Sequence, residues 1–341
     1  MLVPGGAGFI GSNYVRHVLE SSDDSVVVLD KLTYAGNREN LSEYQDSPRV
    51  EFLVGDIADP RIVEAAMRGV DAVVNFAAET HVDRSILDAA SFIDTDVYGV
   101  YVLLEAARVA GVKRFLHVST DEVYGVVPEG SAAEHARLLP RSPYSASKAG
   151  GEMLVYAYYV TYGLPTLVTR GSNTFGPYQY PEKLIPIVIT EALDNRVIPV
   201  YGDGRQVRDW LYVKDHCTGI DLVLRHGDPG EAYNVGGGHE WYNIDVVRRI
   251  LDTLGRPQSL IQHVPDRPGH DIRYSVDSSK LLRLGWDRSR SFESALESTV
   301  RWYVEHQEWW RPIKSSAAYH DYFNRNYGSR SSALHPEPAP N

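Results

Sequence analysis

The chain of 341 residues is long enough for one large or two moderate domains, and its hydrophobic content of 43% is ordinary for a globular protein. Its 34 basic and 45 acidic side chains give a formal net charge of −11 without any basic run, which argues against a nucleic-acid partner. No apolar stretch approaches the ~20 residues that span a bilayer, so we expect no membrane partner. No signal peptide is recognisable, and the only cysteine, Cys217, cannot form an internal disulfide. We therefore expect a cytoplasmic location.

Short apolar strands alternate with helical patterns through the first half of the chain. The predicted strands are rich in β-branched and aromatic residues and cover residues 26–29, 50–54, 72–76, 115–118 and 166–169. The predicted helices cover residues 11–20, 60–69, 88–110, 143–162, 182–194 and 291–307. Apolar strands that alternate with helices are typical of a parallel sheet covered on both faces. We predict an α/β fold with a doubly wound parallel sheet of the Rossmann type and a smaller C-terminal α/β lobe.

The domain organisation follows from where this alternation loosens and Gly and Pro become frequent. We predict a first domain at residues 1–171, to which residues 207–227 return. The smaller lobe is predicted from residues 172–206 and 228–315. Residues 316–341 are expected to form a partly disordered tail.

A glycine-rich loop, Gly5-Gly-Ala-Gly8-Phe-Ile-Gly11, follows a short first strand and opens a helix. Glycines in such a loop let the backbone approach a pyrophosphate, and the helix N-terminus supplies amide donors. The next strand ends in Asp30, at the spacing where a carboxylate binds the adenosine ribose hydroxyls. Because this carboxylate would repel a 2′-phosphate, the sequence predicts NAD rather than NADP. In the same interpretation, Asp56 contacts the adenine. The alternative for both Asp30 and Asp56 is an ordinary turn residue.

Two short stretches carry the chemistry, Ser119-Thr-Asp-Glu-Val-Tyr-Gly125 and Tyr144-Ser-Ala-Ser-Lys148. Tyr144 and Lys148 lie one helical turn apart, and this pair suits the oxidation of an alcohol by a nicotinamide, since the lysine charge lowers the cost of tyrosinate. Asp121 and Glu122 follow an apolar strand. A dehydration needs an acid that protonates the leaving group and a base that removes a carbon-bound proton. The alternatives are that the two acids cap a strand–loop junction and that Tyr144 only packs at a helix start.

With these motifs in this order, the chain resembles the extended short-chain dehydrogenase/reductases and, within them, the dTDP-glucose 4,6-dehydratases. The resemblance runs through most of residues 1–310. Further stretches that fit the subgroup are Asp30–Gly36, Phe76–Ser85, Tyr180–Pro186, Val207–Tyr212 and Asp266–Tyr274. The adjacent acid pair is the most specific feature, because epimerases and decarboxylases of this class usually lack it.

The resemblance implies a role for each residue of the two motifs. Tyr144 would remove the proton of the sugar 4-hydroxyl while hydride passes from C4 to NAD, and Thr120 would hydrogen-bond the same oxygen. Lys148 would hold the nicotinamide ribose and stabilise tyrosinate. Glu122 would take the C5 proton and Asp121 would protonate the departing C6 hydroxyl, before hydride returns to C6.

The resemblance also implies the binding residues, and no metal site. The residues implied for NAD are Gly5, Gly8, Phe9, Ile10, Gly11, Asp30, Lys31, Thr33, Asp56, Ile57, Ala77, Ala78, Tyr144 and Lys148. The residues implied for a nucleotide-diphosphate sugar are Glu79, Thr80, Asn173, Glu182, Lys183, Arg208, Arg267 and His270. Arginine and lysine side chains that face a diphosphate would form charge-assisted bonds. Arg208 and Arg267 could instead be ordinary surface residues.

The helix at 143–162 carries more aromatic residues than one core face requires, since Tyr156, Tyr158, Tyr159 and Tyr162 spread around it. The resemblance implies a homodimer formed by this helix and the predicted helix at residues 88–110. The alternative is a helix that packs fully within one chain.

Three positions depart from the pattern of the family. Pro4 stands before the glycine loop where a threonine is usual. Asp96 follows Thr95 where the family usually has asparagine, and His239 stands where many relatives carry asparagine near the nucleoside. These departures concern cofactor affinity and nucleobase choice, and they leave the expected catalytic groups unchanged.

We interpret the chain as an NAD-dependent lyase that converts dTDP-glucose to dTDP-4-keto-6-deoxyglucose in deoxysugar biosynthesis. One alternative is a 4-epimerase or a dehydratase of another nucleotide hexose, and an epimerase would have no use for Asp121 together with Glu122. The other alternative is a non-catalytic NAD-binding protein.

Overall fold

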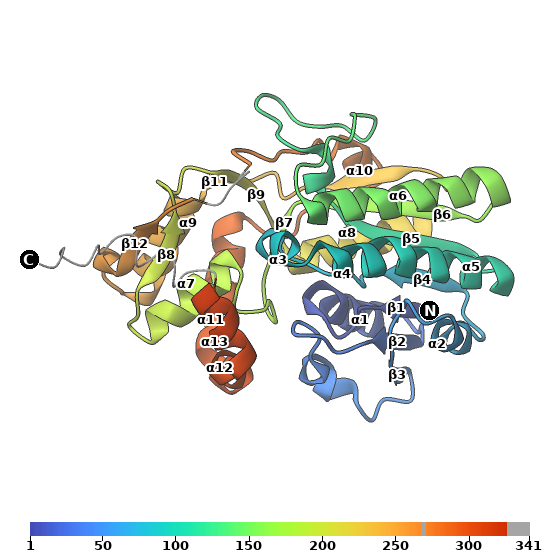
Figure 1. The fold of residues 1–341 in the computed structure, drawn as a ribbon, viewed down its shortest axis with the longest axis horizontal. Helices are drawn as coiled ribbons and strands as arrows, with labels where there is room; N and C mark the ends of the chain where they lie inside the picture. Colours follow the sequence, from blue (N-terminus) through green and yellow to red (C-terminus); the bar gives the residue numbers. More distant parts are fainter. Residues whose placement is uncertain (267–270, 326–341) are drawn as a thin grey trace, which may run out of the picture.

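The computed structural model describes residues 1–266 and 271–325 and consists of a large sheet domain and a smaller lobe beside it (Figure 1). Seven parallel strands form the central sheet in the spatial order β10-β6-β5-β4-β1-β2-β3. Their bounds are β1 (Leu2–Pro4), β2 (Val26–Asp30), β3 (Val50–Val54), β4 (Ala72–Asn75), β5 (Arg114–Thr120), β6 (Thr166–Gly171) and β10 (Ala232–Val235). The strand order reverses between β1 and β4, which confirms the predicted doubly wound sheet. In such sheets, ligands bind at the carboxyl ends of the strands where the order reverses.

Successive residues of the strands point to opposite faces of the sheet and enter two different hydrophobic cores. Leu2 and Phe115 are buried in one core, and their neighbours Val3 and Leu116 are buried in the other. The helices on the Val3 side are α1 (Phe9–Ser21) and α8 (Val213–His226). The helices on the Leu2 side are α2 (Pro60–Ala66), α5 (Val100–Ala110) and α6 (Pro143–Tyr162). Burial on both faces explains why the strands are continuously apolar.

Helix α6 has the predicted bounds because local signals fix both of its ends. Ser142 caps the first turn by accepting a hydrogen bond from the Ser145 N–H at 3.1 Å, and Pro143 occupies the first helical position. Gly163, with φ +69°, ends the helix in the left-handed conformation. This start places Tyr144 in the first turn of the helix.

The predicted helix at residues 88–110 is a helical run with three parts. These are α4 (Ala89–Ile93), a π-helical turn η2 (Asp94–Gly99) and α5. Turns of the π type interrupt α-helices frequently at functional sites. Here the π turn contains Thr95 and Asp96, and both are buried.

The smaller lobe contains two further sheets and the helices packed on them. The strands are β7 (Asn173–Phe175), β9 (Val207–Tyr212) and β11 (Glu240–Tyr242) in one sheet and β8 (Ile198–Tyr201) with β12 (Ile261–Val264) in the other. The main helices are α7 (Leu184–Leu193), α9 (Asn243–Leu254) and α11 (Phe292–Glu305). The remaining short elements are α3 (Val82–Leu87), α10 (Ser279–Arg283), η1 (Arg38–Tyr44), η3 (Asp121–Tyr124) and η4 (Gln258–Leu260). No described helix is both long and apolar enough to cross a membrane.

Two segments lie differently from the predicted division of the chain. Residues 207–227 split between the two parts, because β9 pairs in the lobe while α8 packs on α1. Strand β10, from the segment 228–315 predicted for the lobe, is instead the edge strand of the central sheet, since Ala232 to Val235 pair with β6 in parallel register. The two domains therefore exchange segments more than once along the chain.

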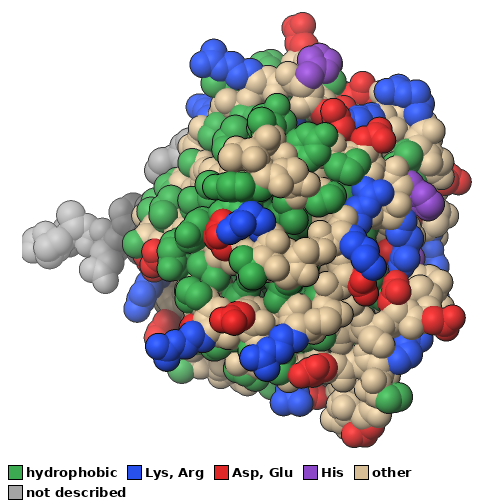
Figure 2. Space-filling view, turned by 90° about the vertical axis from the view of Figure 1, so that its right-hand side faces the viewer, with side chains coloured by type: hydrophobic (Ala, Val, Ile, Leu, Met, Phe, Trp, Pro, Cys, Tyr) green, Lys and Arg blue, Asp and Glu red, His purple; other side chains and the backbone are tan. Residues whose placement is uncertain are grey.

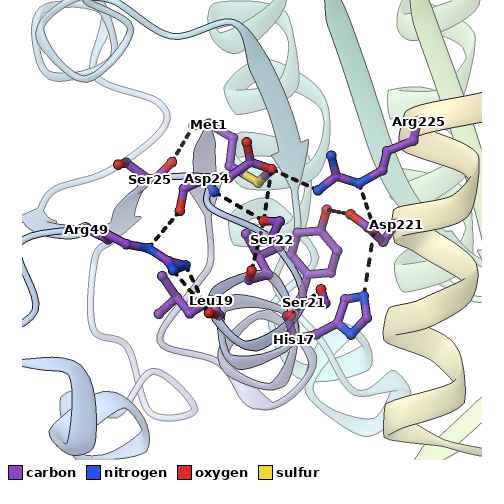
Figure 3. A network of polar contacts seen from close by, with 12 residues as sticks. Met1, His17, Leu19, Ser21, Ser22, Asp24, Ser25, Arg49, Asp221 and Arg225 are labelled. Atoms are coloured by element: carbon purple, nitrogen blue, oxygen red, sulfur yellow. Dashed lines mark hydrogen bonds and ion pairs between the residues drawn. The ribbon is translucent and has the colours of Figure 1, made fainter.

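Helix α8 is tied to the end of α1 by a polar network (Figure 3). Arg225 donates to Asp221 and to Asp24, each at 2.8 Å, and the hydroxyl of Tyr14 donates to Asp221 at 3.2 Å. The N-terminal ammonium group donates to the Ser25 carbonyl at 2.7 Å. These contacts hold α1, whose other end carries the glycine loop.

Residues after 305 continue as two helices, α12 (Gln307–Ser315) and α13 (Ala317–Phe323). The tail expected at residues 316–341 therefore begins with a helix, in which Tyr319 and Tyr322 are buried. Residues 326–341 lie outside the described part of the chain.

Candidate active site

A cavity of about 210 Å³ opens at the carboxyl ends of the central strands. The residues predicted for the cofactor all line it: Gly5, Gly8, Phe9, Ile10, Gly11, Asp30, Lys31, Thr33, Asp56, Ile57, Ala77, Ala78, Tyr144 and Lys148. They come from the glycine loop and from the ends of β2, β3 and β4 and the start of α6. We call this space the cofactor cavity.

The glycine loop fits a dinucleotide because side chains are excluded where the backbone turns. Gly5 has φ +73°, and a Cβ atom there would lie 2.5 Å from the Ala77 nitrogen. A Cβ atom at Gly11 would lie 2.3 Å from the Gly5 carbonyl oxygen. No side chain caps the start of α1 at Gly8, so the first amides of this helix can bind an anionic group.

Asp30 lies at the end of β2, next to the glycine loop. Its carboxylate accepts hydrogen bonds from the Ala7 N–H at 3.0 Å and the Leu32 N–H at 2.8 Å. Burial raises the pKa of Asp30, although the two hydrogen bonds and the nearby charge of Lys31 lower it. The two backbone bonds fix the orientation of this carboxylate in the wall of the cofactor cavity.

The two catalytic motifs meet beside this cavity. Thr120 ends β5, and its hydroxyl oxygen accepts a hydrogen bond from the Glu122 N–H at 3.3 Å, which caps η3. Lys148, buried on α6, donates through Nζ to the Val118 carbonyl at 2.8 Å. Thr120, Glu122 and Tyr144 line a second cavity of about 290 Å³, and Asp121 lines it as well. We call it the substrate cavity.

The two cavities meet at a junction that is lined from both sides. The residues that line both are Phe9, Ile10, Thr80, Ser119, Tyr144, Gln179, Glu182 and Lys183. A cofactor in one cavity and a second ligand in the other would therefore come together beside Tyr144. This is the arrangement that a transfer between two bound molecules requires.

The surroundings of Asp121 favour its protonated form. Burial raises the pKa of Asp121 well above its usual range, the negative charges of Glu122 and Asp209 raise it further, and Arg208 opposes them. Its Oδ2 atom is buried and has no hydrogen-bond partner among the described residues. A carboxylic acid that keeps its proton near neutral pH can act as a general acid.

The phenol of Tyr144 is in a different electrostatic setting from the one predicted. Burial raises its pKa well above the usual value, the charges of Glu122 and Asp96 add to this, and a hydrogen bond with Thr120 opposes it. Burial also lowers the pKa of Lys148, whose ammonium group is engaged with the backbone of β5. Burial and the neighbouring carboxylates therefore act on this phenol against the effect expected of Lys148.

Asp96 is a buried acid behind this site. Its carboxylate accepts hydrogen bonds from the Glu79 N–H at 3.1 Å and from the Ser147 hydroxyl at 2.7 Å. Burial raises its pKa to about 6, although the charge of Lys148 opposes the rise. Asp96 thus connects the loop that follows β4 with α6.

The residues predicted for the nucleotide sugar divide into three groups. Those that line the substrate cavity are Thr80, Asn173, Glu182, Lys183 and Arg208. Glu79 lines neither cavity, and its carboxylate pairs at 3.1 Å with Lys31, which lines the cofactor cavity. Arg267 and His270 lie outside the described residues. His239 lines a separate small cavity and donates its backbone N–H to Asp209 at 2.8 Å.

Several residues of the substrate cavity were not predicted from the sequence. Ser119, Gln206, Trp210 and Asn243 line it, and each has a buried polar atom without a hydrogen-bond partner in the described part of the chain. Unsatisfied buried polar groups are rare in folded proteins, so these atoms indicate positions for ligand groups. Ser119 and Trp210 stand within recognised stretches of the sequence and Gln206 stands beside one, whereas no recognised stretch lies near Asn243. Within the described ranges, no cluster of His, Cys, Asp and Glu could hold a metal ion.

Comparisons with known proteins show which proteins this chain is similar to. The family model described as GDP-mannose 4,6 dehydratase matches residues 2–299. The low-salt glycan biosynthesis protein Agl12 of Haloferax volcanii is 52% identical over 308 residues, which cover 90% of this chain and 99% of that protein. The dTDP-glucose 4,6-dehydratase of Streptomyces niveus is 50% identical, with 92% and 96% covered.

A solved structure extends the similarity to the fold. The crystal structure of DesIV, a dTDP-glucose 4,6-dehydratase from Streptomyces venezuelae, was determined with NAD and TYD bound. It has a TM-score of 0.90 and 51% sequence identity to this chain, and the alignment covers 92% of this chain and 99% of that one.

Proposed function

The chain belongs to the family of nucleotide-sugar 4,6-dehydratases, and on that premise we propose that it converts dTDP-glucose to dTDP-4-keto-6-deoxyglucose with NAD as a regenerated cofactor. The central-sheet domain binds NAD and the smaller lobe binds the nucleotide sugar. The reaction serves deoxysugar biosynthesis, in the cytoplasm.

The observation that carries this proposal is the pair of adjacent acids beside the cavity junction. Asp121 is buried and its pKa is raised by that burial, which favours the protonated form that can give a proton to a leaving group. Glu122 lines the same cavity and lies close enough for its charge to raise the pKa of Tyr144. An epimerase needs neither acid, and a binding protein needs neither the acids nor Tyr144.

The first step is the oxidation of the sugar at C4. Tyr144 removes the proton of the 4-hydroxyl, and Thr120 hydrogen-bonds the oxygen as it becomes a ketone. When bound, NAD supplies the hydride acceptor for C4, the hydride donor for C6, and a positive charge that opposes the carboxylates beside Tyr144. Lys148 orients the cofactor ribose at the same end of α6.

The second step is the elimination of water. The C4 ketone acidifies the C5–H bond, Glu122 takes this proton, and Asp121 gives its proton to the C6 hydroxyl, which leaves as water. Hydride is then added at C6, and C5 regains a proton from Glu122. The net change is the loss of one water from dTDP-glucose, with C4 oxidised and C6 reduced.

Incubation with dTDP-, UDP-, GDP- and CDP-glucose, followed by mass spectrometry, tests the proposal and the choice of nucleobase. We expect loss of one water with dTDP-glucose. An isomeric product of unchanged mass would indicate an epimerase, and the absence of any turnover would favour a binding protein.

We also propose that the protein is a homodimer through the outer faces of η2, α5 and α6. Large apolar side chains are exposed there: Tyr98, Tyr101, Val109, Met153, Tyr156, Tyr159, Val160 and Tyr162. Val109 is 78% exposed and Val160 is 62% exposed. Figure 2 shows hydrophobic side chains gathered over this side of the molecule. Exposed apolar patches of this kind mark protein interfaces.

Sedimentation at micromolar concentration tests the dimer. We expect Val160→Lys to give monomers, because a charge would be buried in the contact. Val54→Lys is the matched control, since Val54 is also exposed but lies on β3, away from α5 and α6. A monomeric wild-type protein would contradict the proposal.

A further inference from the structure

Arg84 of α3 pairs with Glu182, which lines both cavities at their junction. Its guanidinium group donates to Glu182 from Nη2 at 2.8 Å and from Nε at 3.1 Å. The same group lies over the ring of Tyr34, 3.5 Å from its centroid, and over the ring of Tyr322, 4.2 Å from its centroid. Arg84 is thus held by aromatic rings while its donors point at one carboxylate.

The residues around Arg84 come from separate parts of the chain and are themselves fixed. The Tyr34 hydroxyl donates to the Thr80 carbonyl at 2.9 Å. The Tyr322 hydroxyl lies 3.3 Å from His81 Nδ1. Tyr322 belongs to α13, the helix at the start of the segment that the sequence predicted as a tail. The C-terminal helix therefore reaches His81, next to Thr80, which lines both cavities.

The segment that carries Glu182 is anchored to the C-terminal helices as well. Tyr303 of α11 donates its hydroxyl to the Gln179 carbonyl, and Tyr319 of α13 donates to the Pro181 carbonyl at 3.2 Å. Helix α13 thus contacts Arg84 itself and Pro181, the residue before Glu182.

Glu182 depends on this pair for its position. Its side chain is only 1% exposed, and it lines both cavities at the junction. A buried carboxylate without a partner is costly, and the fork of an arginine fixes a carboxylate in two directions at once. Rings on Arg84 restrict the rotation of the guanidinium group and so restrict Glu182.

We propose that Arg84 is a positioning residue that fixes Glu182 for recognition of the hexose, and that Tyr322 of α13 holds Arg84 in place. This inference rests on the proposed function and adds to it the C-terminal helix as part of the sugar-binding machinery. Glu182 faces the hexose rather than the nucleoside, since the junction is where cofactor and sugar meet. Loss of the contacts between Tyr322, Arg84 and Glu182 should therefore weaken dTDP-glucose binding but leave dTDP binding unchanged.

The test compares Tyr322→Ala, which removes the ring, with Tyr322→Phe, which keeps the ring and loses only the hydroxyl. Asp321→Ala changes an exposed residue of the same helix and is the control. Calorimetry with dTDP-glucose and with dTDP gives the two dissociation constants, and steady-state kinetics gives KM and kcat separately. We expect Tyr322→Ala to weaken dTDP-glucose binding and raise KM by roughly tenfold, since misplaced positioning groups cost up to ~10²-fold. Tyr322→Phe should restore most of this loss.

Arg84→Lys provides a second test that does not alter α13. It keeps the charge but loses the fork and the stacking, and we expect the same selective loss of dTDP-glucose binding. Three results would overturn the inference: unchanged dTDP-glucose binding in both Tyr322→Ala and Arg84→Lys, an equal loss of dTDP binding, or a Tyr322→Phe variant as weak as the alanine. Because binding is measured directly, a wild-type protein that binds dTDP-glucose without dehydrating it would refute the proposed function and not this inference.

Discussion

Replacement of Asp96 by asparagine should stabilise the protein at neutral pH and not at acidic pH. Burial raises the pKa of Asp96 from its ordinary value of 3.8 to about 6. A carboxyl group whose pKa is raised by folding contributes stability that is complete below its unfolded pKa and is lost as the pH rises through the folded pKa. A rise of about two units corresponds to about 3 kcal/mol of unfolding free energy, which is lost between about pH 4 and pH 6.

Asparagine fits the site of Asp96 without a charge. Its carbonyl can accept from the Glu79 N–H, as the carboxylate does at 3.1 Å. Its amide can donate to Ser147 Oγ, because that hydroxyl can give its own proton to the Tyr144 carbonyl at 2.8 Å. Lys148 loses an opposite charge but keeps its bond to Val118. The gain is therefore expected to reach at most about 3 kcal/mol above pH 7 and to be small near pH 4.

Urea unfolding of the protein at pH 4 and pH 8 measures this difference. Asp94→Asn is the control, since it removes the same charge from an exposed position of the same π turn. A variant Asp96→Asn that is no more stable than the wild type at pH 8, or whose advantage is equal at both pH values, would refute the reasoning.

Four further outcomes are expected. Glu122→Gln should still oxidise C4, seen as absorbance of the reduced nicotinamide, while the yield of dehydrated product and solvent deuterium at C5 fall by ~10²–10⁴-fold, as for loss of a general base. Wild-type-like dehydration by this variant would count against the assigned base. Asp30 should make the apoprotein bind NAD more tightly than NADP, and titration with equal or tighter NADP binding would contradict its role. Trp309 Nε1 donates a hydrogen bond to Asn40 at 2.8 Å, and the Asn40 amide donates to the glycine loop. Trp309→Phe should therefore weaken NAD binding by about two- to tenfold, the usual net value of one hydrogen bond. Unchanged NAD affinity in a titration would exclude this link. Arg225 lowers the pKa of Asp24, with which it pairs. Arg225→Ala should therefore reduce the free energy of unfolding at pH 7 by at most about 1 kcal/mol, as for exposed ion pairs. In unfolding experiments, this difference from the wild type should vanish as the pH falls below ~4.

The central sheet could be predicted because its signals are local. Each strand is a short apolar run, and Gly8, Ser142 and Gly163 are residue types that mark helix ends. The segment of strand β10 was assigned to the smaller lobe instead of the central sheet, because a run of four residues, Ala232–Val235, carries no information about its partner β6. Pairing across such a separation in sequence depends on tertiary contacts.

The pKa values of the site show a second limit of the sequence. The spacing of Tyr144 and Lys148 predicted that the lysine charge would favour tyrosinate. In the structure, burial and the nearby carboxylates have the larger effect and raise the pKa of Tyr144. Burial depends on the whole fold, and the four-residue spacing cannot report it.

The groups expected to do the chemistry and the groups that position them differ in how far apart they lie in the chain. Thr120, Asp121, Glu122, Tyr144 and Lys148 fall within 29 positions of one another, so their order alone suggested a reaction. The contacts that hold the cavity junction are distant: Arg84 meets Glu182 across 98 positions, and Tyr322 meets His81 across 241. A tyrosine near the end of a chain has no local feature that distinguishes it from a residue of a loose tail. It follows that substitutions in α12 and α13 should alter the binding of cofactor and sugar while the acid–base groups stay intact, and that such effects cannot be anticipated from the motifs.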